Sequence, residues 1–76
     1  MTTMSQKILD YMQQEYKKRV SNNSNITDDS ARCFSQEELC KSLNLNIDTI
    51  EEATSELNSY GYVEKWITGV VKLLKD

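Results

Sequence analysis

Apolar residues near the start of the chain recur at the spacing of an amphipathic helix. They place one stripe on its surface: Ile8, Leu9, Met12 and Tyr16. Ser5 can cap the first turn, so we expect a helix over residues 6–19. Residues 21–32 are polar, rich in Ser, Asn and Asp, and have no hydrophobic period, which predicts a long loop.

A capping box marks the start of a second helix. The Ser35 hydroxyl can accept a backbone N–H of the first turn, and the Glu38 carboxylate can reach back to the N–H of Ser35. This pattern predicts a helix over residues 36–43, and residues 33–34 before it are candidates for a short strand. Asn44 suits a left-handed backbone position in the turn that follows the helix.

A third helix and a hairpin complete the pattern. Asn46 can cap a helix over residues 47–59, and Gly61 can end it in a conformation that costs other residues more. Residues 62–74 contain β-branched and aromatic side chains on both sides of a Thr68-Gly69 turn signal, which predicts a two-stranded β-hairpin. Apolar residues form the inward face of the two helices and their turn: Leu39, Cys40, Leu43, Leu45, Ile50, Ala53 and Leu57.

The spacing of apolar residues from the second helix to the hairpin resembles that of winged helix-turn-helix regulators of bacteria and phages. The residues that carry the likeness are Leu39, Leu43, Leu45, Ile50, Ala53, Leu57, Gly61 and Val63. The resemblance implies one domain over residues 1–76 with an α+β, mostly helical fold. Three helices would form the winged helix-turn-helix, and a C-terminal two-stranded β-hairpin would be its wing. It also implies that helix 47–59 enters a DNA major groove.

The charge of the chain departs from that family. Nine basic and twelve acidic residues give a net charge of −3, and residues 35–60 alone sum to −5. Recognition helices usually present Arg, Lys, Asn or Gln to the bases. Here the candidate DNA- or partner-contacting residues of helix 47–59 are Asp48, Thr49, Glu51, Glu52, Ser55 and Glu56. Acids on this face would approach a lattice of phosphates, which disfavours tight DNA binding.

Basic residues gather at two other places in the sequence. Lys65 and Lys72 can form a modest basic strip along the hairpin, facing DNA or a partner. Lys17, Lys18 and Arg19 either contact the phosphate backbone or balance the dipole at the C-terminus of the first helix. Their different directions around a helix favour the second role.

The fold resemblance favours a non-catalytic binding module, a DNA-linked transcriptional regulator or accessory subunit. One alternative is a protein–protein interaction module whose acidic third helix docks on a basic protein surface without binding DNA. Another is a homodimer with aromatic anchors, for which Tyr11 is the best candidate. An enzyme is disfavoured because the chain has no histidine, no glycine-rich phosphate loop and no convergent pair of acids.

Length and composition set further bounds. The 76 residues make one small domain, and no apolar run is long enough to span a membrane. No signal peptide is visible, so we expect a cytoplasmic protein. Cys33 and Cys40 without any histidine cannot build an ordinary zinc site, and we expect them to act as small apolar side chains. We expect no metal, no cofactor and no small-molecule substrate.

Overall fold

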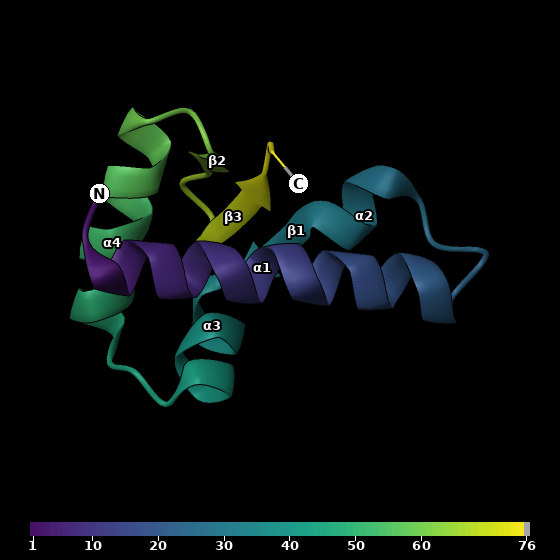
Figure 1. The fold of residues 1–76 in the computed structure, drawn as a ribbon, viewed down its shortest axis with the longest axis horizontal. Coiled ribbons are helices and arrows are strands. Elements are labelled where there is room, and N and C mark those ends of the chain that lie inside the picture. Colours follow the sequence, from purple (N-terminus) through teal and green to yellow (C-terminus); the bar gives the residue numbers. More distant parts are fainter. Residues whose placement is uncertain (76) are drawn as a thin grey trace.

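The structure is a computed structural model that describes residues 1–75 (Figure 1). Within these residues, four helices and three strands form an α+β arrangement. In chain order they are α1 (Thr3–Asn22), α2 (Asp28–Arg32), β1 (Cys33–Ser35), α3 (Gln36–Leu43), α4 (Ile47–Ser59), β2 (Val63–Lys65) and β3 (Val70–Leu73).

Helix α1 extends beyond the predicted span of residues 6–19 at both ends. Thr2 caps it instead of Ser5, because the Thr2 backbone is extended and its hydroxyl accepts the N–H of Ser5 at 3.1 Å. Ser5 is fully buried, and its hydroxyl donates to the backbone carbonyl of Ala53 on α4 at 3.4 Å. The predicted apolar stripe is confirmed, since three of its residues are buried and the fourth packs beside them: Ile8, Leu9, Met12 and Tyr16.

The loop predicted over residues 21–32 is wrong at both ends, because α1 continues to Asn22 and α2 occupies Asp28–Arg32. Thr27 caps α2 by accepting the N–H of Ser30 at 3.1 Å, and two aspartates in the first turn suit the positive end of the helix dipole. Ala31 is completely buried as α2 packs against α1. A single buried methyl in a polar segment was too weak a hydrophobic signal to predict a helix.

Helix α3 begins where the capping box predicted, although only half of the box forms. The Ser35 hydroxyl accepts the N–H of Glu38 at 2.9 Å. The Glu38 carboxylate binds the guanidinium of Arg19 instead of turning back to the backbone of Ser35. The ion pair with Arg19 of α1 therefore replaces the hydrogen bond that the capping box predicted between Glu38 and the backbone of Ser35.

The turn and the end of α4 follow the local signals in the sequence. Asn44 takes the left-handed conformation with φ 54° and ψ 49°. Asn46 caps α4 by accepting the N–H of Thr49 at 2.8 Å. Gly61 follows the helix with φ 80°, a conformation in which a Cβ would be strained. These predictions are confirmed.

The sheet differs from the expected two-stranded hairpin, because β1 adds a third strand. Both β1 and β2 pair antiparallel with β3, in the order β1-β3-β2. The prediction of a short strand near Cys33 and Phe34 is confirmed. Phe34 lies opposite Val71, and both side chains are buried. Pairing with β3 gives the backbone of β1 hydrogen-bond partners while Phe34 enters the core. The predicted count of three helices and two strands is thus corrected to four and three.

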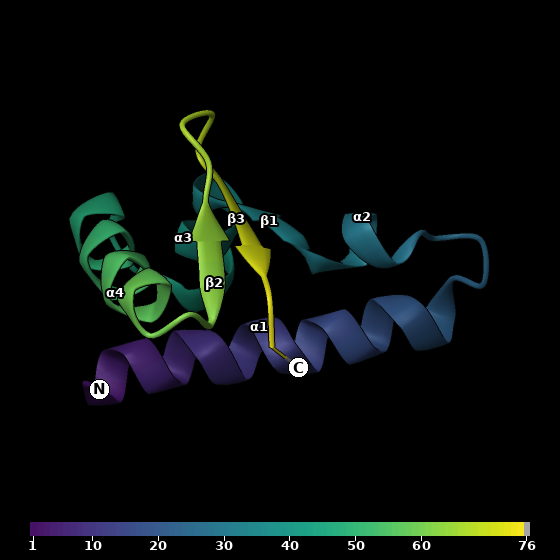
Figure 2. The same cartoon turned by 90° about the horizontal axis from the view of Figure 1, so that it is seen from above.

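The core lies where α1, α4 and the sheet meet (Figure 2). Its buried residues are Ile8, Leu9, Met12, Phe34, Leu39, Ile50, Ala53, Leu57, Val63, Val71 and Leu73. The first turns of α1 lie against α4, and α2 lies over the opposite end of α1 (Figures 1 and 2). This packing buries one side of α4 and leaves its other side open to solvent.

Candidate functional site

The side of α4 that points away from the core carries acidic side chains. Four exposed residues form what we call the acidic face: Asp48, Glu51, Glu52 and Ser55. They share one side of α4 because residues three and four apart are neighbours on a helix, and α4 buries Ile50, Ala53 and Leu57 on the other side. The predicted contact residues Thr49 and Glu56 lie beside this face and are half-buried.

Two carboxylates of the acidic face have no cationic partner. Within residues 1–75, neither Asp48 nor Glu52 belongs to an ion pair, and no side chain donates a hydrogen bond to either. Both side chains are exposed. They are uncompensated negative charges close together on α4.

Glu51, in contrast, is neutralised by the hairpin. Lys65 donates to the Glu51 carboxylate at 2.5 Å and to the Ser55 hydroxyl at 2.9 Å. The Gln36 amide donates to the other carboxylate oxygen of Glu51. The hydrogen bond from Lys65, followed by that from Gln36, holds the pKa of Glu51 below its usual range. Lys65 therefore ties β2 to α4, and only 19% of its side chain remains exposed.

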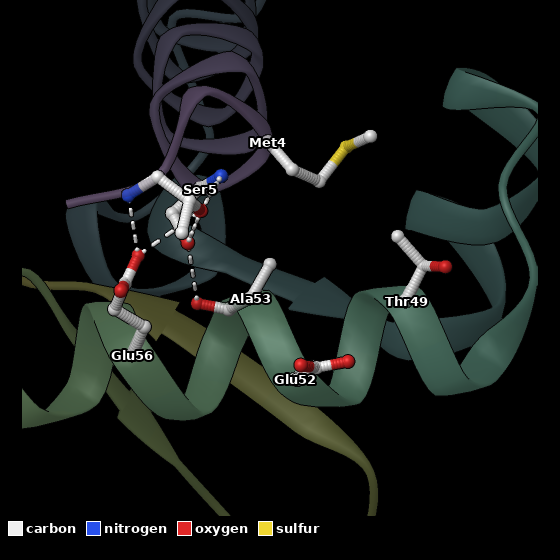
Figure 3. A pocket seen from close by; sticks show the side chains of 7 residues that line it. Met4, Ser5, Thr49, Glu52, Ala53 and Glu56 are labelled. Atoms are coloured by element: carbon white, nitrogen blue, oxygen red, sulfur yellow. Dashed lines mark hydrogen bonds between the residues drawn. The ribbon is translucent and has the colours of Figure 1, made fainter.

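Glu56 is tied to the start of α1. Its carboxylate accepts the backbone N–H of Thr2 at 2.9 Å and the Thr2 hydroxyl at 3.2 Å (Figure 3). The nearby Ser5 hydroxyl, followed by the hydrogen bonds from Thr2, lowers the pKa of Glu56. Glu56 thus remains ionised at neutral pH, while its carboxylate is turned toward the N-terminal segment.

Two further predicted basic contacts, Lys72 and Arg19, are engaged within the chain, as Lys65 is. The Lys72 ammonium lies 3.1 Å from the Asp29 carboxylate, and the hydrogen bond to Asp29 raises the pKa of Lys72. The Arg19 guanidinium donates to the backbone carbonyls of Ala31 at 3.3 Å and Cys33 at 2.9 Å.

Arg19 also covers an aromatic ring in the core. Its guanidinium carbon lies 4.1 Å from the centroid of the Phe34 ring, and a nitrogen binds the Glu38 carboxylate. Only 19% of the Arg19 side chain is exposed. The guanidinium joins α1 to α2, β1 and α3, and has little freedom to reach an external phosphate.

Lys17 and Lys18 are exposed, but they lie at the end of α1 far from α4 (Figure 1). The structure therefore does not bring Lys17 and Lys18 together with the predicted contact residues of α4. A ligand on the acidic face would meet neither of these two lysines.

The tip of the β2–β3 hairpin is apolar and uncharged. It projects away from α1 in Figure 2. Trp66 and Ile67 are exposed there, and the Trp66 indole N–H donates to the Glu64 carboxylate at 2.6 Å. Ile67 is fully exposed because the chain leaves β2 after Lys65.

A cavity of about 280 Å³ opens between the start of α1 and α4. It is lined by Thr2, Met4, Ser5, Thr49, Glu52, Ala53 and Glu56. In Figure 3, Met4 extends from α1 above Ala53 and Thr49, and Glu52 lies beside them on α4. Sequence patterns did not predict the contribution of Thr2 and Met4, because these residues are about 50 positions from their α4 neighbours in the chain.

The described residues offer little for metal chemistry. Within residues 1–75, no group of three or more His, Cys, Asp or Glu side chains is placed to hold a metal ion. Cys33 and Cys40 are free thiols and partly buried. No helix in the same part of the chain combines the length and apolar character required to cross a membrane.

Comparison with protein-family models, curated proteins and solved structures found no match to this chain. A functional proposal therefore rests on the geometry and charge of its own residues.

Proposed function

We propose that the chain is a winged-helix domain that binds protein rather than DNA. In this proposal, the acidic face of α4 contacts a basic surface on the partner. The protein has no catalytic role, and α4 takes the place of a recognition helix.

The order of elements supports the winged-helix assignment. Helix α3, a turn at Asn44–Asn46 and helix α4 form a helix-turn-helix, and the β2–β3 hairpin follows in the position of a wing. The sheet formed by β1, β3 and β2 packs on the helices through Phe34, Val63 and Val71. Because one fold can host many functions, this arrangement by itself does not identify the ligand.

The distribution of charge on and around α4 carries the functional proposal. The acidic face exposes two carboxylates, Asp48 and Glu52, that have no ion-pair partner among the described residues 1–75. Three of the five basic side chains predicted to contact DNA are engaged elsewhere: Lys65 with Glu51, Lys72 with Asp29, and Arg19 with Glu38. A helix with this face in a major groove would place negative charge near both phosphate walls, within about 8 Å, where salt screens it incompletely.

The same face suits a partner rich in Lys or Arg. Unpaired surface carboxylates raise the rate of encounter with a basic partner and disfavour acidic ones. Ile47 is 50% exposed at the start of α4, one turn before Glu51, and supplies an apolar contact at the edge of the acidic face. Protein interfaces usually combine apolar contacts with polar and charged residues.

Fluorescence anisotropy with two labelled probes tests this proposal. One probe is a 12-residue peptide of alternating Arg and Gly, and the other is a mixed-sequence duplex DNA of 20 base pairs, both at about 20 mM salt, where electrostatic binding is strongest. We expect the peptide to bind and the duplex not to bind. Binding of the duplex as tight as that of the peptide would overturn the proposal.

A matched pair of variants tests whether the peptide binds at α4. The double variant Asp48→Asn/Glu52→Gln should weaken peptide binding by about two- to thirtyfold, since each exposed ion pair contributes roughly 0.2–1 kcal/mol. The control Asp10→Asn/Glu37→Gln changes the net charge equally at exposed sites outside the acidic face. Equal weakening by both variants would contradict a binding site on α4.

A further inference from the structure

We propose that the cavity between α1 and α4 is a subsite for one arginine side chain of the partner. This inference rests on the proposed function and adds a specific anchor to it. The aliphatic part of the arginine would lie between Met4 and Ala53, and its guanidinium would bind the Glu52 carboxylate at the edge of the cavity.

The size of the cavity suits a single side chain. Its volume is about 280 Å³, below the roughly 300–1,000 Å³ of ordinary small-molecule pockets. It lies against the core rather than on a flat surface, because Met4 packs on the core cluster and only 6% of Ala53 is exposed. A partner side chain that enters it loses water on more than one side.

The walls of the cavity are apolar where they face one another. Met4 extends from α1, with Ala53 and Thr49 of α4 opposite it (Figure 3). A thioether is polarizable and adapts to the shape of its neighbour. These walls suit the methylene groups of a long side chain, which commonly pack along apolar surface while the charged end stays outside.

The polar groups of the cavity select a cation. Glu52 lines it and has no cationic partner among residues 1–75. Glu56 adds a second carboxylate, although Thr2 already donates two hydrogen bonds to it. Asp48 lies one turn from Glu52 on the exposed side of α4, so a basic segment on the acidic face passes the opening of the cavity.

An arginine side chain fits the cavity better than a metal ion does. No metal-binding group of three or more ligands exists within residues 1–75, and a metal ion would leave the apolar walls unused. The guanidinium is planar, weakly hydrated and able to donate two parallel hydrogen bonds to one carboxylate. It can therefore satisfy Glu52 at the edge while its stem displaces water from Met4 and Ala53.

The test follows the methyl resonances of the methionines in the ¹³C-labelled protein. The probes are the capped pentapeptide Gly-Gly-Arg-Gly-Gly and its analogue with citrulline, which keeps the shape of arginine and lacks the charge. We expect a saturable shift of the Met4 methyl with the arginine peptide, and no shift of the Met12 methyl, which is fully buried in the core. Citrulline should weaken binding by about tenfold or more.

Three variants locate the site. Thr49→Leu fills the cavity and keeps the acidic face, and Glu52→Gln removes the carboxylate with little change of shape. Both should weaken pentapeptide binding at least about threefold, whereas Asp48→Asn, outside the cavity, should weaken it less. An unmoved Met4 methyl, an equal response to citrulline, or unchanged binding by Thr49→Leu would overturn the subsite.

The two proposals fail in different ways. If only the subsite is wrong, the 12-residue Arg-Gly peptide still loses affinity in the Asp48→Asn/Glu52→Gln variant, while Thr49→Leu binds it normally. If the proposed function is wrong, that peptide shows no dependence on Asp48 and Glu52 at all.

Discussion

Replacement of Arg19 by methionine separates a structural role from a phosphate-contacting role for this side chain. Methionine keeps an unbranched apolar chain over the Phe34 ring but removes the charge and every hydrogen-bond donor. Lys18→Met is the matched control, because Lys18 is its exposed neighbour on α1. Both variants lower the net charge equally.

The contacts of Arg19 give the expected magnitude. The variant leaves the backbone carbonyls of Ala31 and Cys33 without their donor, which costs about 1 kcal/mol for each. Loss of the partly exposed ion pair with Glu38 adds about 0.2–1 kcal/mol. We expect the free energy of unfolding to fall by about 2–3 kcal/mol, which is a Tm decrease of roughly 10–20 °C for a domain of this size.

Urea unfolding followed by far-ultraviolet circular dichroism provides the measurement. Arg19→Met should lower the midpoint at unchanged slope, and Lys18→Met should stay within about 0.5 kcal/mol of the unmodified protein. If the two variants have the same stability, Arg19 does not join α1 to α2 and β1 as described. Arg19 would then return as a candidate for external contacts.

Three further outcomes follow from backbone conformation and from the lowered pKa values. Asn44→Gly should leave stability within about 0.5 kcal/mol, whereas Asn44→Ala should lower it by about 1 kcal/mol in thermal melts, because only the first suits φ 54°. Gly61→Ala should lower the free energy of unfolding by about 1 kcal/mol or more, because alanine is strained at a φ of 80°. A steric clash is not the cause, since a Cβ at this position meets no atom within 4 Å. An unchanged stability in urea titrations would contradict this expectation. Glu51 and Glu56 have pKa values below 4.5 in the folded state, so their stabilisation is present above pH 4.5 and is lost as the pH falls through the folded values. Glu51→Gln should therefore flatten the decline of the urea midpoint between neutral pH and about pH 3, and an unchanged decline would refute that assignment.

Local signals predicted α3, α4 and the turn between them well, because each signal depends on a few neighbouring residues. The Ser35 and Asn46 caps bond to backbone groups three positions away. Asn44 and Gly61 are residue types that accept a left-handed backbone, and both adopt one. The apolar spacing of Ile50, Ala53 and Leu57 directly gives the buried side of α4.

Contacts between distant parts of the chain explain what the sequence did not reveal. Ser5 has the right chemistry for a cap, yet it is buried against Ala53, 48 positions away, and Thr2 caps α1 instead. The sequence did not reveal that Arg19 donates to the backbone carbonyls of Ala31 and Cys33, because these residues lie 12 and 14 positions away and only the fold brings them to α1. The sequence identifies Phe34 as an apolar residue, but it does not reveal that β1 pairs with β3.

The candidate site, like the fold, could be predicted from the sequence only in part. The acidic residues of helix 47–59 were visible in the sequence, as was the side of the helix that they occupy. Their individual states were not, because Lys65 reaches Glu51 from the hairpin and Thr2 reaches Glu56 from the start of the chain. Only the tertiary structure shows that no cation of the described part of the chain, residues 1–75, pairs with Asp48 or Glu52.

Amide chemical-shift mapping of the ¹⁵N-labelled protein gives the most direct evidence on where a ligand binds. Titration with the 12-residue Arg-Gly peptide should shift the amides of Asp48, Glu52 and Ser55, and leave those of Lys17 and Lys18 unchanged. Titration with the 20-base-pair duplex under the same low-salt conditions should shift none of these amides. Shifts along α4 caused by the duplex, or peptide shifts confined to surfaces other than α4, would contradict a protein-binding role for the acidic face.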